Sequence, residues 1–292
     1  MIDGVPCIDA HQHYWDPARG DYFWMTSGSS LDRVFAPEDL LPSLKRSGIV
    51  GSVLVQAAPS LEETDYLLAI ADREPTVLGV VGWIDFEDRT HIAALERFKR
   101  NPKFKGVRPM IQDIADPLWV KHPNITWAFD ALVDLGLTFD ALLHPQHILP
   151  LLRRLSRHPD LKVVVDHAAK PRIRDGAYEG WAADLARLAA ETGACAKLSG
   201  LATEAHEGTP LMELGPYVDH LLAVFGPDRV MFGSDWPVCL RATTYDDWFD
   251  AAAELTSALS VEGCAAVFGG SAIRFYGLDA SPPLALGPPT GL

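Results

Sequence analysis

The stretch Ile-Asp-Ala-His-Gln-His-Tyr-Trp-Asp-Pro at residues 8–17 decides the fold, together with Met-Phe-Gly-Ser-Asp-Trp-Pro at residues 231–237. His11 and His13 end the first apolar run of the chain, and Asp235 follows the last one. Residues two apart on a strand point to the same face, so the two imidazoles lie on one side. A closed barrel of parallel strands brings its first and last strands together, with the catalytic residues at the strand carboxyl ends. We therefore expect an enzyme, and a metal-assisted hydrolase in particular.

Short apolar runs alternate with amphipathic segments along the chain, and most of these runs are nearly continuous Val, Ile, Leu and Ala. Such runs are typical of parallel strands that are buried on both faces. A strand–helix unit repeated eight times predicts a (β/α)8 barrel rather than an open doubly wound sheet. The predicted strands are Val5–Ala10, Ser52–Gln56, Leu78–Ile84, Phe104–Pro109, Thr138–Leu143, Lys162–Asp166, Ala194–Leu198 and Arg229–Phe232. The predicted helices are Pro37–Ser47, Glu62–Arg73, Thr90–Arg100, Ile125–Leu135, Ile148–Arg157, Tyr178–Thr192, Leu211–Phe225, Tyr245–Ala258 and Val261–Tyr276.

Several predicted helices end in a glycine just before the next strand, as helices with a left-handed C-cap do. We expect one barrel domain over residues 1–280 and a flexible Pro-rich tail over residues 281–292. The loop Asp16–Val34 is long for a compact domain and carries several aromatic residues, so we expect a lid or a binding loop there. The glycines expected to cap helices are Gly48, Gly136, Gly193 and Gly226.

The bulk composition excludes several classes of partner. The 292 residues carry a net charge of −14, which argues against binding to nucleic acid or to an anionic membrane surface. No apolar stretch approaches the ~20 residues needed to span a bilayer, and no export signal is evident. The four cysteines lack metal-site spacing and are expected to be reduced thiols. These features predict a cytoplasmic enzyme with a small-molecule substrate, and they leave a homo-oligomer possible.

Polar residues at the ends of the predicted strands are the candidates for chemistry, because the site of a barrel enzyme lies there. Neutral imidazole is a good ligand for zinc and related ions, and a carboxylate can complete such a site. Each candidate also has a structural explanation: the histidines could be hydrogen-bonded core residues, and Asp235 could be a helix N-cap. Arg108 could form an ion pair or hold a carbonyl or carboxylate group. The candidates are His11, His13, Gln56, Asp85, Arg108, His144, His167, Lys197, Ser199 and Asp235.

Four segments, at residues 8–17, 165–171, 197–201 and 231–237, resemble the amidohydrolase-related (amidohydrolase 2) family. Within that family they are most similar to sugar-lactone hydrolases, in particular those that act on L-fuconolactone. Residues 15–22 strengthen this narrower resemblance, which covers about residues 6 to 277. The resemblance implies a distorted (β/α)8 TIM barrel of the amidohydrolase superfamily type, and hydrolysis of an aldonolactone to the aldonic acid.

The resemblance also implies how the site is built. His11, His13, His167 and Asp235 would surround one divalent metal, for which zinc is expected and which some family members do without. Arg108 ends the fourth strand where a bridging carboxylated lysine would otherwise be expected, which argues against a two-metal site. On this hypothesis Asp235 is the general base and later the acid, while the metal, His167 or Arg108 polarises the lactone carbonyl.

Substrate-binding roles follow from the same hypothesis. Aromatic rings can stack on the sugar, and amide or carboxylate groups can bond its hydroxyls. There are two alternative substrates: a carboxylated lactone of the muconolactone or pyrone type, or the substrate of a decarboxylase. Each would need several cationic groups at the strand ends. Only Arg108 is clearly placed there, while Arg19, Arg33 and Arg241 are possible on loops, and this favours a neutral, polyol-like substrate. The residues expected to bind substrate are Gln56, Trp24, Trp83, Asp85, His144, Lys197 and Trp236.

Overall fold

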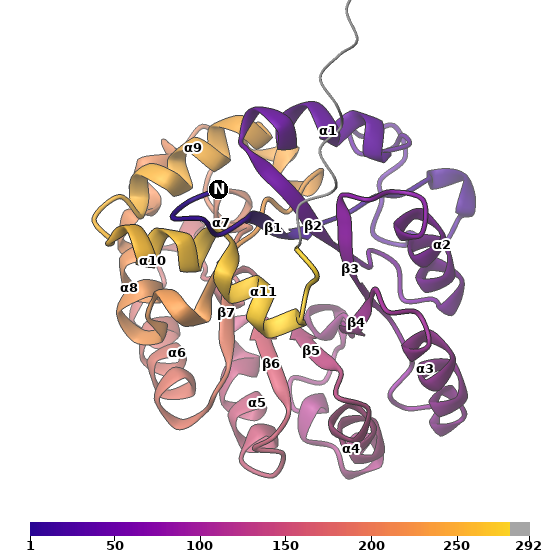
Figure 1. Ribbon diagram of the computed structural model, residues 1–292. Helices are drawn as coiled ribbons and strands as arrows, with labels where there is room; N and C mark the ends of the chain where they lie inside the picture. The colour runs from indigo at the N-terminus through magenta and orange to yellow at the C-terminus, as the bar shows by residue number, and fades with distance from the viewer. Residues whose placement is uncertain (281–292) are drawn as a thin grey trace, which may run out of the picture.

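A computed structural model describes residues 1–280 of the chain, and the predicted tail at 281–292 lies outside the described residues. Eight parallel strands form one sheet in chain order, as the sequence predicts, and the sheet curls into a barrel (Figure 1). The first strand continues through His11 to Gln12, two residues beyond its predicted end. The strands are β1 Cys7–Gln12, β2 Ile49–Val55, β3 Val77–Gly82, β4 Phe104–Val107, β5 Thr138–Ala141, β6 Lys162–Val165, β7 Cys195–Leu198 and β8 Val230–Phe232.

Helices surround the strands in Figure 1, and each predicted helix has a counterpart. The short α7 was not predicted, and the last predicted helix is interrupted by a π-helical turn at Ala266–Gly270. A Cβ on Gly269 would lie 1.9 Å from the carbonyl oxygen of Pro6, so only glycine lets this turn approach the entry to β1. The helices are α1 Pro37–Arg46, α2 Leu61–Ala71, α3 Ile92–Lys99, α4 Thr126–Leu135, α5 Ile148–Leu155, α6 Glu179–Glu191, α7 Leu201–Glu204, α8 Gly215–Phe225, α9 Tyr245–Leu255, α10 Val261–Ala265 and α11 Ser271–Tyr276.

Three of the four expected glycine caps, Gly48, Gly136 and Gly226, have positive φ, and Gly193 does not. The prediction for Gly193 is wrong because α6 ends on Thr192 instead. The Thr192 hydroxyl donates to the carbonyl of Leu188 (2.7 Å) and accepts the N–H of Ala194 (3.2 Å). The chain therefore leaves α6 through an extended threonine and needs no left-handed residue.

The barrel closes between β8 and β1 through residues that follow β8. The backbone N–H of Asp235 donates to the carbonyl of His11 (2.8 Å), and the N–H of His13 donates to the carbonyl of Trp236 (2.7 Å). A Cβ on Gly233 would lie 2.7 Å from the Cβ of His11, so the two segments can approach this closely only over a glycine. Closure therefore places Asp235 beside His11 of β1 and His13, which follows the end of β1.

The two ends of the barrel differ in what covers them. At the end where the strands begin, α11 lies across the strands in Figure 1, and Tyr276 and Ala272 pack with Ile8, Val53 and Met231. This packing covers the amino ends of the strands with apolar side chains. The carboxyl ends of the strands meet the long connecting loops instead. None of the helices within residues 1–280 is long and apolar enough to cross a membrane.

The loop that follows β1 is packed rather than loose. Trp15 is fully buried and donates its indole N–H to the carbonyl of Leu31 (3.1 Å), and its ring contacts Tyr22 and Trp24. Trp24 donates its indole N–H to the carbonyl of Ala57 (2.7 Å), in the loop after β2. The first loop is therefore fastened to the second at the barrel mouth.

A buried carboxyl group supports the second loop in turn. Glu63 of α2 is fully buried and accepts the backbone N–H groups of Ala57 (3.0 Å) and Ala58 (2.7 Å). Burial raises the pKa of Glu63 to about 8, although these two hydrogen bonds act in the opposite direction. Glu63 therefore binds its proton more tightly in the folded chain than in the unfolded chain.

Replacing Gly233 by alanine should lower the free energy of unfolding by roughly 1–3 kcal/mol, because the added methyl group forces β8 away from His11. Urea denaturation measures the change. The matched control is Gly180→Ala in α6, where an added Cβ meets no atom within 4 Å and alanine is the better helix former. Equal unfolding midpoints for the two variants would contradict this account of the closure.

Replacing Glu63 by glutamine should change how stability depends on pH. Between about pH 4.5 and pH 8 the folded chain holds the Glu63 proton and the unfolded chain does not, so this group makes the protein less stable as pH rises. The variant lacks this loss and should gain on the order of 5 kcal/mol relative to wild type between those limits. Urea unfolding at both pH values tests this, and parallel pH profiles for the two proteins would refute it.

Candidate active site

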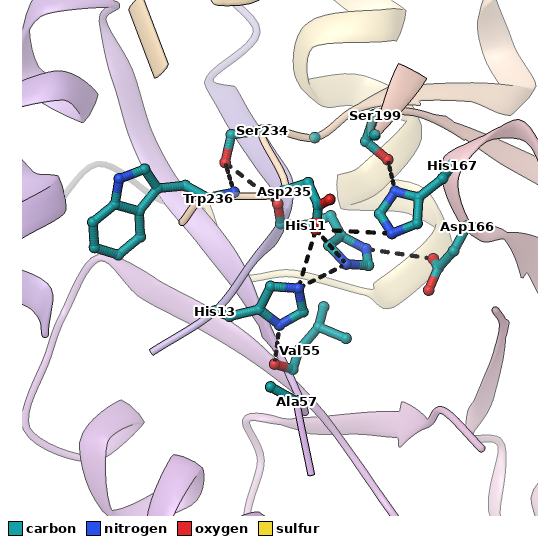
Figure 2. A network of polar contacts seen from close by, with 12 residues as sticks. His11, His13, Val55, Ala57, Asp166, His167, Ser199, Ser234, Asp235 and Trp236 are labelled. Atoms are coloured by element: carbon teal, nitrogen blue, oxygen red, sulfur yellow. Dashed lines mark hydrogen bonds and ion pairs between the residues drawn. The ribbon is translucent and has the colours of Figure 1, made fainter. Parts of the chain in front are cut away.

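Three histidines and one aspartate meet at the carboxyl end of the barrel. His11 and His13 extend from β1, His167 follows β6, and Asp235 follows β8. The Nε2 atoms of His11 and His13 lie 3.2 Å apart, and His13 Nε2 is 3.2 Å from Oδ1 of Asp235. The same oxygen lies 3.7 Å from His11 Nε2 and 3.8 Å from His167 Nε2. Figure 2 shows the three imidazoles around this carboxylate, as the sequence predicts for residues far apart in the chain.

The outer nitrogen of each imidazole has its own partner. His13 donates its Nδ1 proton to the carbonyl of Val55 (2.7 Å), which leaves the Nε2 lone pair of neutral His13 facing the cluster (Figure 2). His167 Nδ1 lies 2.8 Å from the hydroxyl of Ser199. His11 Nδ1 lies 3.0 Å from the ammonium of Lys197 and 3.4 Å from a carboxylate oxygen of Asp166. These contacts fix the orientation of the rings.

The backbone at the site adopts conformations that L-residues rarely take. The four residues His167–Lys170 have φ between 49° and 60°, and Asp235 has a φ of 57°. Left-handed backbone costs an L-residue roughly 1–2 kcal/mol, and such strain gathers at functional sites. A Cβ on Gly200 would lie 2.6 Å from His167 Nδ1, so this glycine leaves space for the imidazole. The strained turn therefore aims His167 at Asp235.

Burial and neighbouring charges set the protonation states. Burial lowers the pKa of His13 and lowers that of His167 to about 4, although Asp235 acts in the opposite direction on both. Burial and the Lys197 charge together lower the pKa of His11. Burial alone would raise the pKa of Asp235, but the surrounding histidines outweigh it and hold that pKa far below its ordinary value. At neutral pH the site therefore consists of neutral imidazoles around an ionised carboxylate.

This group of atoms fits a divalent cation. A tetrahedral zinc ion with ligand distances of about 2.0–2.1 Å keeps its ligand atoms about 3.3 Å apart. The cluster has two ligand–ligand distances of 3.2 Å, and the distances from Asp235 Oδ1 to His11 and His167 are 3.7 and 3.8 Å. Atoms of His11, His167 and Asp235 lie within 4.8 Å of one another. The donor types are the imidazole nitrogen and carboxylate oxygen that zinc and related ions prefer.

A hollow of about 200 Å³ opens onto this cluster. Arg108 lines it, and its Nη2 group donates to the carbonyl of Gln56. The Nε atom of Arg108 is buried and has no hydrogen-bond partner within residues 1–280. Lys170 and Arg241 also line the hollow, so it holds two cationic residues besides Arg108, where sequence analysis clearly placed only Arg108. Other lining residues are His13, Trp24, Leu31, Ala57, Met110, Gln112, Leu142, His167, Asp235 and Val238.

The other predicted substrate-binding residues lie in different places. Trp83 and Asp85 line a second hollow of about 330 Å³, which shares Met110 with the first. Gln56 is fully buried and donates its amide N–H to the carbonyl of Arg108 (2.5 Å). Of the residues expected to bind substrate, the structure therefore brings only Trp24 to the wall of the hollow that contains Asp235.

Lys197, Trp236 and His144 do not line either hollow. Lys197 is fully buried, with its ammonium 2.6 Å from Asp140 and 2.9 Å from Asp166. The ring of Trp236 points away from the cluster in Figure 2 and packs against Phe35. His144 is half-buried beside His147. Lys197 and Trp236 thus contact other groups of the protein, and their roles in substrate binding stay predictions.

Sequence reasoning did not single out several residues around the site. Asp140 lies on β5, where a carboxylate inside an apolar run was the available signal. Asp166 directly precedes His167, in the same motif as Lys170. Arg241, in contrast, is one of the arginines that the sequence placed as possible on loops, and it reaches the hollow through a short helical turn after the motif that contains Asp235. Only the closed barrel shows that these residues share one end of the molecule.

Comparison with known proteins agrees with this geometry. The family model described as amidohydrolase matches residues 8–278. The chain is 41% identical to an L-fucono-1,5-lactonase of Burkholderia ambifaria over 93% of this chain and 96% of that protein. It is 34% identical to an L-fucono-1,5-lactonase of Burkholderia multivorans over 94% of this chain and 97% of that protein.

Solved structures show the same fold. A crystal structure of an amidohydrolase from Burkholderia multivorans with bound zinc superposes with a TM-score of 0.88 at 34% identity, covering 94% of this chain and all of that one. A second crystal form of an amidohydrolase from that organism, with bound HEPES, gives a TM-score of 0.89 at 33% identity and the same coverage. With eight strands in barrel order and a family match over nearly its whole length, this chain belongs to the amidohydrolase family.

Proposed function

We propose that the protein hydrolyses a sugar lactone to the open aldonic acid, with L-fucono-1,5-lactone or a close relative as substrate. The observation that carries the proposal is the ionised Asp235, set among neutral imidazoles at the floor of a hollow that is the right size for one sugar ring. The two relatives that are more than 30% identical over most of the chain are both L-fucono-1,5-lactonases, which supports the same substrate class.

Asp235 is the proposed general base and acid. The contacts of Asp235 with the three imidazoles use Oδ1, so Oδ2 remains to accept a proton from the attacking water. The water oxygen adds to the lactone carbonyl carbon and forms a tetrahedral oxyanion. The bond from that carbon to the ring oxygen then breaks, and the proton held by Asp235 passes to the ring oxygen. The product is the hydroxy acid, and the carboxylate of Asp235 is restored.

Arg108 is the proposed oxyanion donor. Its buried Nε–H has no partner within the described residues, and leaving such a group unpaired is costly unless a ligand accepts from it. The adjacent Nη2 group is held by the Gln56 carbonyl, so the guanidinium plane is fixed before substrate binds. His167, fixed by Ser199, borders the same space. These groups would stabilise negative charge that develops on the carbonyl oxygen.

We propose that His11, His13, His167 and Asp235 would hold one divalent cation, with zinc as the expected ion. When bound, such an ion polarises a carbonyl oxygen or lowers the pKa of a water molecule. A zinc-bound amidohydrolase structure at 34% identity supports the ion and the fold together. The protein's own residues still supply the base, the oxyanion donor and the walls of the hollow. A cytoplasmic location and a homo-oligomeric state stay predictions.

Trp24 is proposed to stack on the sugar ring, since it lines the hollow and is fixed by its bond to Ala57. Trp83 and Asp85 would contact only those parts of a substrate that extend past Met110 into the second hollow. Gln56 would act by holding Arg108 rather than by bonding a hydroxyl group. His144 is kept as a more distant candidate for substrate binding.

A carboxylated lactone is the second candidate substrate. Lys170 and Arg241 join Arg108 around the hollow, and together they could bind a carboxylate of the substrate. Lys170 is already near Glu204, 3.8 Å away, which reduces the charge available to a ligand. The two sugar-lactonase relatives favour the neutral sugar lactone over this alternative.

Acid release from a panel of lactones, followed with a pH indicator, tests the function. We expect fast release from L-fucono-1,5-lactone or from L-galactono-, D-arabinono- or L-rhamnonolactone, and slow release from 2-pyrone-4,6-dicarboxylate. Asp235→Asn should lower turnover by at least about 10²–10⁴-fold, because the amide cannot accept the proton. The catalytic assignment fails if Asp235→Asn keeps wild-type turnover. If acid is released only from 2-pyrone-4,6-dicarboxylate, the substrate is a carboxylated lactone instead of a sugar lactone.

The position of the sugar ring is tested with two tryptophan variants. Trp24→Ala should raise KM for a monosaccharide lactone about tenfold, equivalent to roughly 1.4 kcal/mol of lost stacking. Trp83→Ala is the matched control and should leave that KM within about twofold, because Trp83 lines the other hollow. A larger effect of Trp83→Ala than of Trp24→Ala would move the ring to the second hollow.

A further inference from the structure

Lys197 occupies a position that the proposed reaction does not use. It lies on β7 beneath the cluster, and its side chain is fully buried. An ammonium group has three N–H donors and no acceptor. Three acceptor atoms lie within 3.0 Å of Nζ: Asp140 Oδ2 at 2.6 Å, Asp166 Oδ1 at 2.9 Å and His11 Nδ1 at 3.0 Å. Asp140 and His11 accept hydrogen bonds from Nζ, whereas Asp166 forms an ion pair with it and accepts no hydrogen bond within residues 1–280.

The neighbours of Lys197 hold it in place. Asp140 also accepts the hydroxyl proton of Tyr276 (2.6 Å), from the helix that covers the other end of the barrel. Asp166 lies 3.5 Å from Arg108 as well as beside Lys197. A buried lysine between two carboxylates cannot readily turn away, since the ammonium and Asp140 would lose their ion pair. One N–H of Lys197 is therefore directed at His11 Nδ1.

This contact favours the tautomer of His11 in which Nδ1 carries no proton. When Nδ1 accepts from Lys197, the proton of neutral His11 must be on Nε2. That N–H then faces the Nε2 lone pair of His13, 3.2 Å away, whose Nδ1 proton is already given to Val55. Arg108 acts against this tautomer, because its Nη1 donor lies 3.3 Å from the same Nε2, but that contact is longer than the 3.0 Å from Lys197 to Nδ1. The two histidines therefore differ: His13 presents a lone pair to the site and His11 presents an N–H group.

A metal ion needs the opposite arrangement at His11. To bind a cation through Nε2, His11 must carry its proton on Nδ1, and the acceptor available there is Asp166 Oδ1 at 3.4 Å. Lys197, at the shorter distance of 3.0 Å, competes for the same nitrogen. Lys197 and Asp166 thus favour different tautomers of one imidazole.

We propose that Lys197 is a positioning residue that holds His11 in the Nε2–H tautomer and thereby weakens metal binding at the cluster. The metal-free site then presents His11 as a hydrogen-bond donor toward His13 and Asp235. Metal binding requires His11 to transfer its Nδ1 contact from Lys197 to Asp166. This inference concerns the metal site of the proposed function and is independent of the substrate.

The tautomer of His11 can be measured directly in the wild-type protein. After removal of metal with a chelator, long-range ¹H–¹⁵N correlation spectra distinguish a protonated Nε2 from a protonated Nδ1, and a His11→Gln variant assigns the signals. We expect His11 with the proton on Nε2 and His13 with the proton on Nδ1. A proton on Nδ1 of His11 in the metal-free protein would overturn the proposal. This measurement needs no variant of Lys197 to fold.

Metal affinity provides the second measurement. The variant Lys197→Met/Asp140→Asn removes the competing donor and one carboxylate together, so the net charge of the pair stays at zero. Zn²⁺ affinity, measured by competition with a chromophoric chelator, should rise about tenfold or more, the usual weight of a hydrogen bond from a charged group. Co²⁺ absorption spectra should show the change in coordination at the same site.

Asp140→Asn alone is the matched control, because it keeps Lys197 and its contact with His11. Its Zn²⁺ affinity should stay within about threefold of wild type. Equal affinities for the double variant, the control and the wild type would overturn the proposal, provided that circular dichroism shows all three folded. Both readouts are independent of lactone hydrolysis. The proposal for Lys197 can therefore hold in a protein without lactonase activity, and it can be overturned in an active lactonase.

Discussion

The hydrogen bond from the backbone N–H of Asp235 to the carbonyl of His11 is the constraint on which the rest of the structure depends. It closes the barrel between the last strand and the first, and it also places the carboxylate of Asp235 against the two histidines. Gly233 makes the approach possible, because any side chain there would meet the Cβ of His11. Fold closure and site assembly are thus one event, so a change that loosens the closure also moves Asp235 away from its partners.

Buried charge is concentrated at one end of the barrel and is matched there group by group. Lys197 lies between Asp140 and Asp166, and Asp166 is also near Arg108. Ionised groups in a dry interior persist only when such partners exist. The imidazoles nearby are neutral because burial lowers their pKa values. The imidazole lone pairs and the carboxylate of Asp235 therefore suit a cation, and the guanidinium of Arg108 suits an oxyanion.

Sequence patterns predicted the eight strand–helix units because buried parallel strands read as continuous apolar runs. They also predicted that His11, His13, His167 and Asp235 converge, because residues at strand carboxyl ends must meet in a barrel. The patterns were wrong for the Gly193 cap, since the Thr192 side chain ends α6 without a left-handed residue. They also put Lys197 among the substrate-binding residues, because a position at a strand end does not say how deep a side chain lies in the barrel.

The barrel, its strand order and the convergence of His11, His13, His167 and Asp235 followed from the sequence alone, because periodicity and motif position are local properties of the chain. The tertiary structure alone decided which face of each strand end opens to the hollow. It placed Trp24 there, placed Trp83 in the neighbouring hollow, and turned Lys197 inward toward His11. It also imposed left-handed backbone on His167 and Asp235, which local preference disfavours. Such features depend on contacts between distant segments, so no local pattern encodes them.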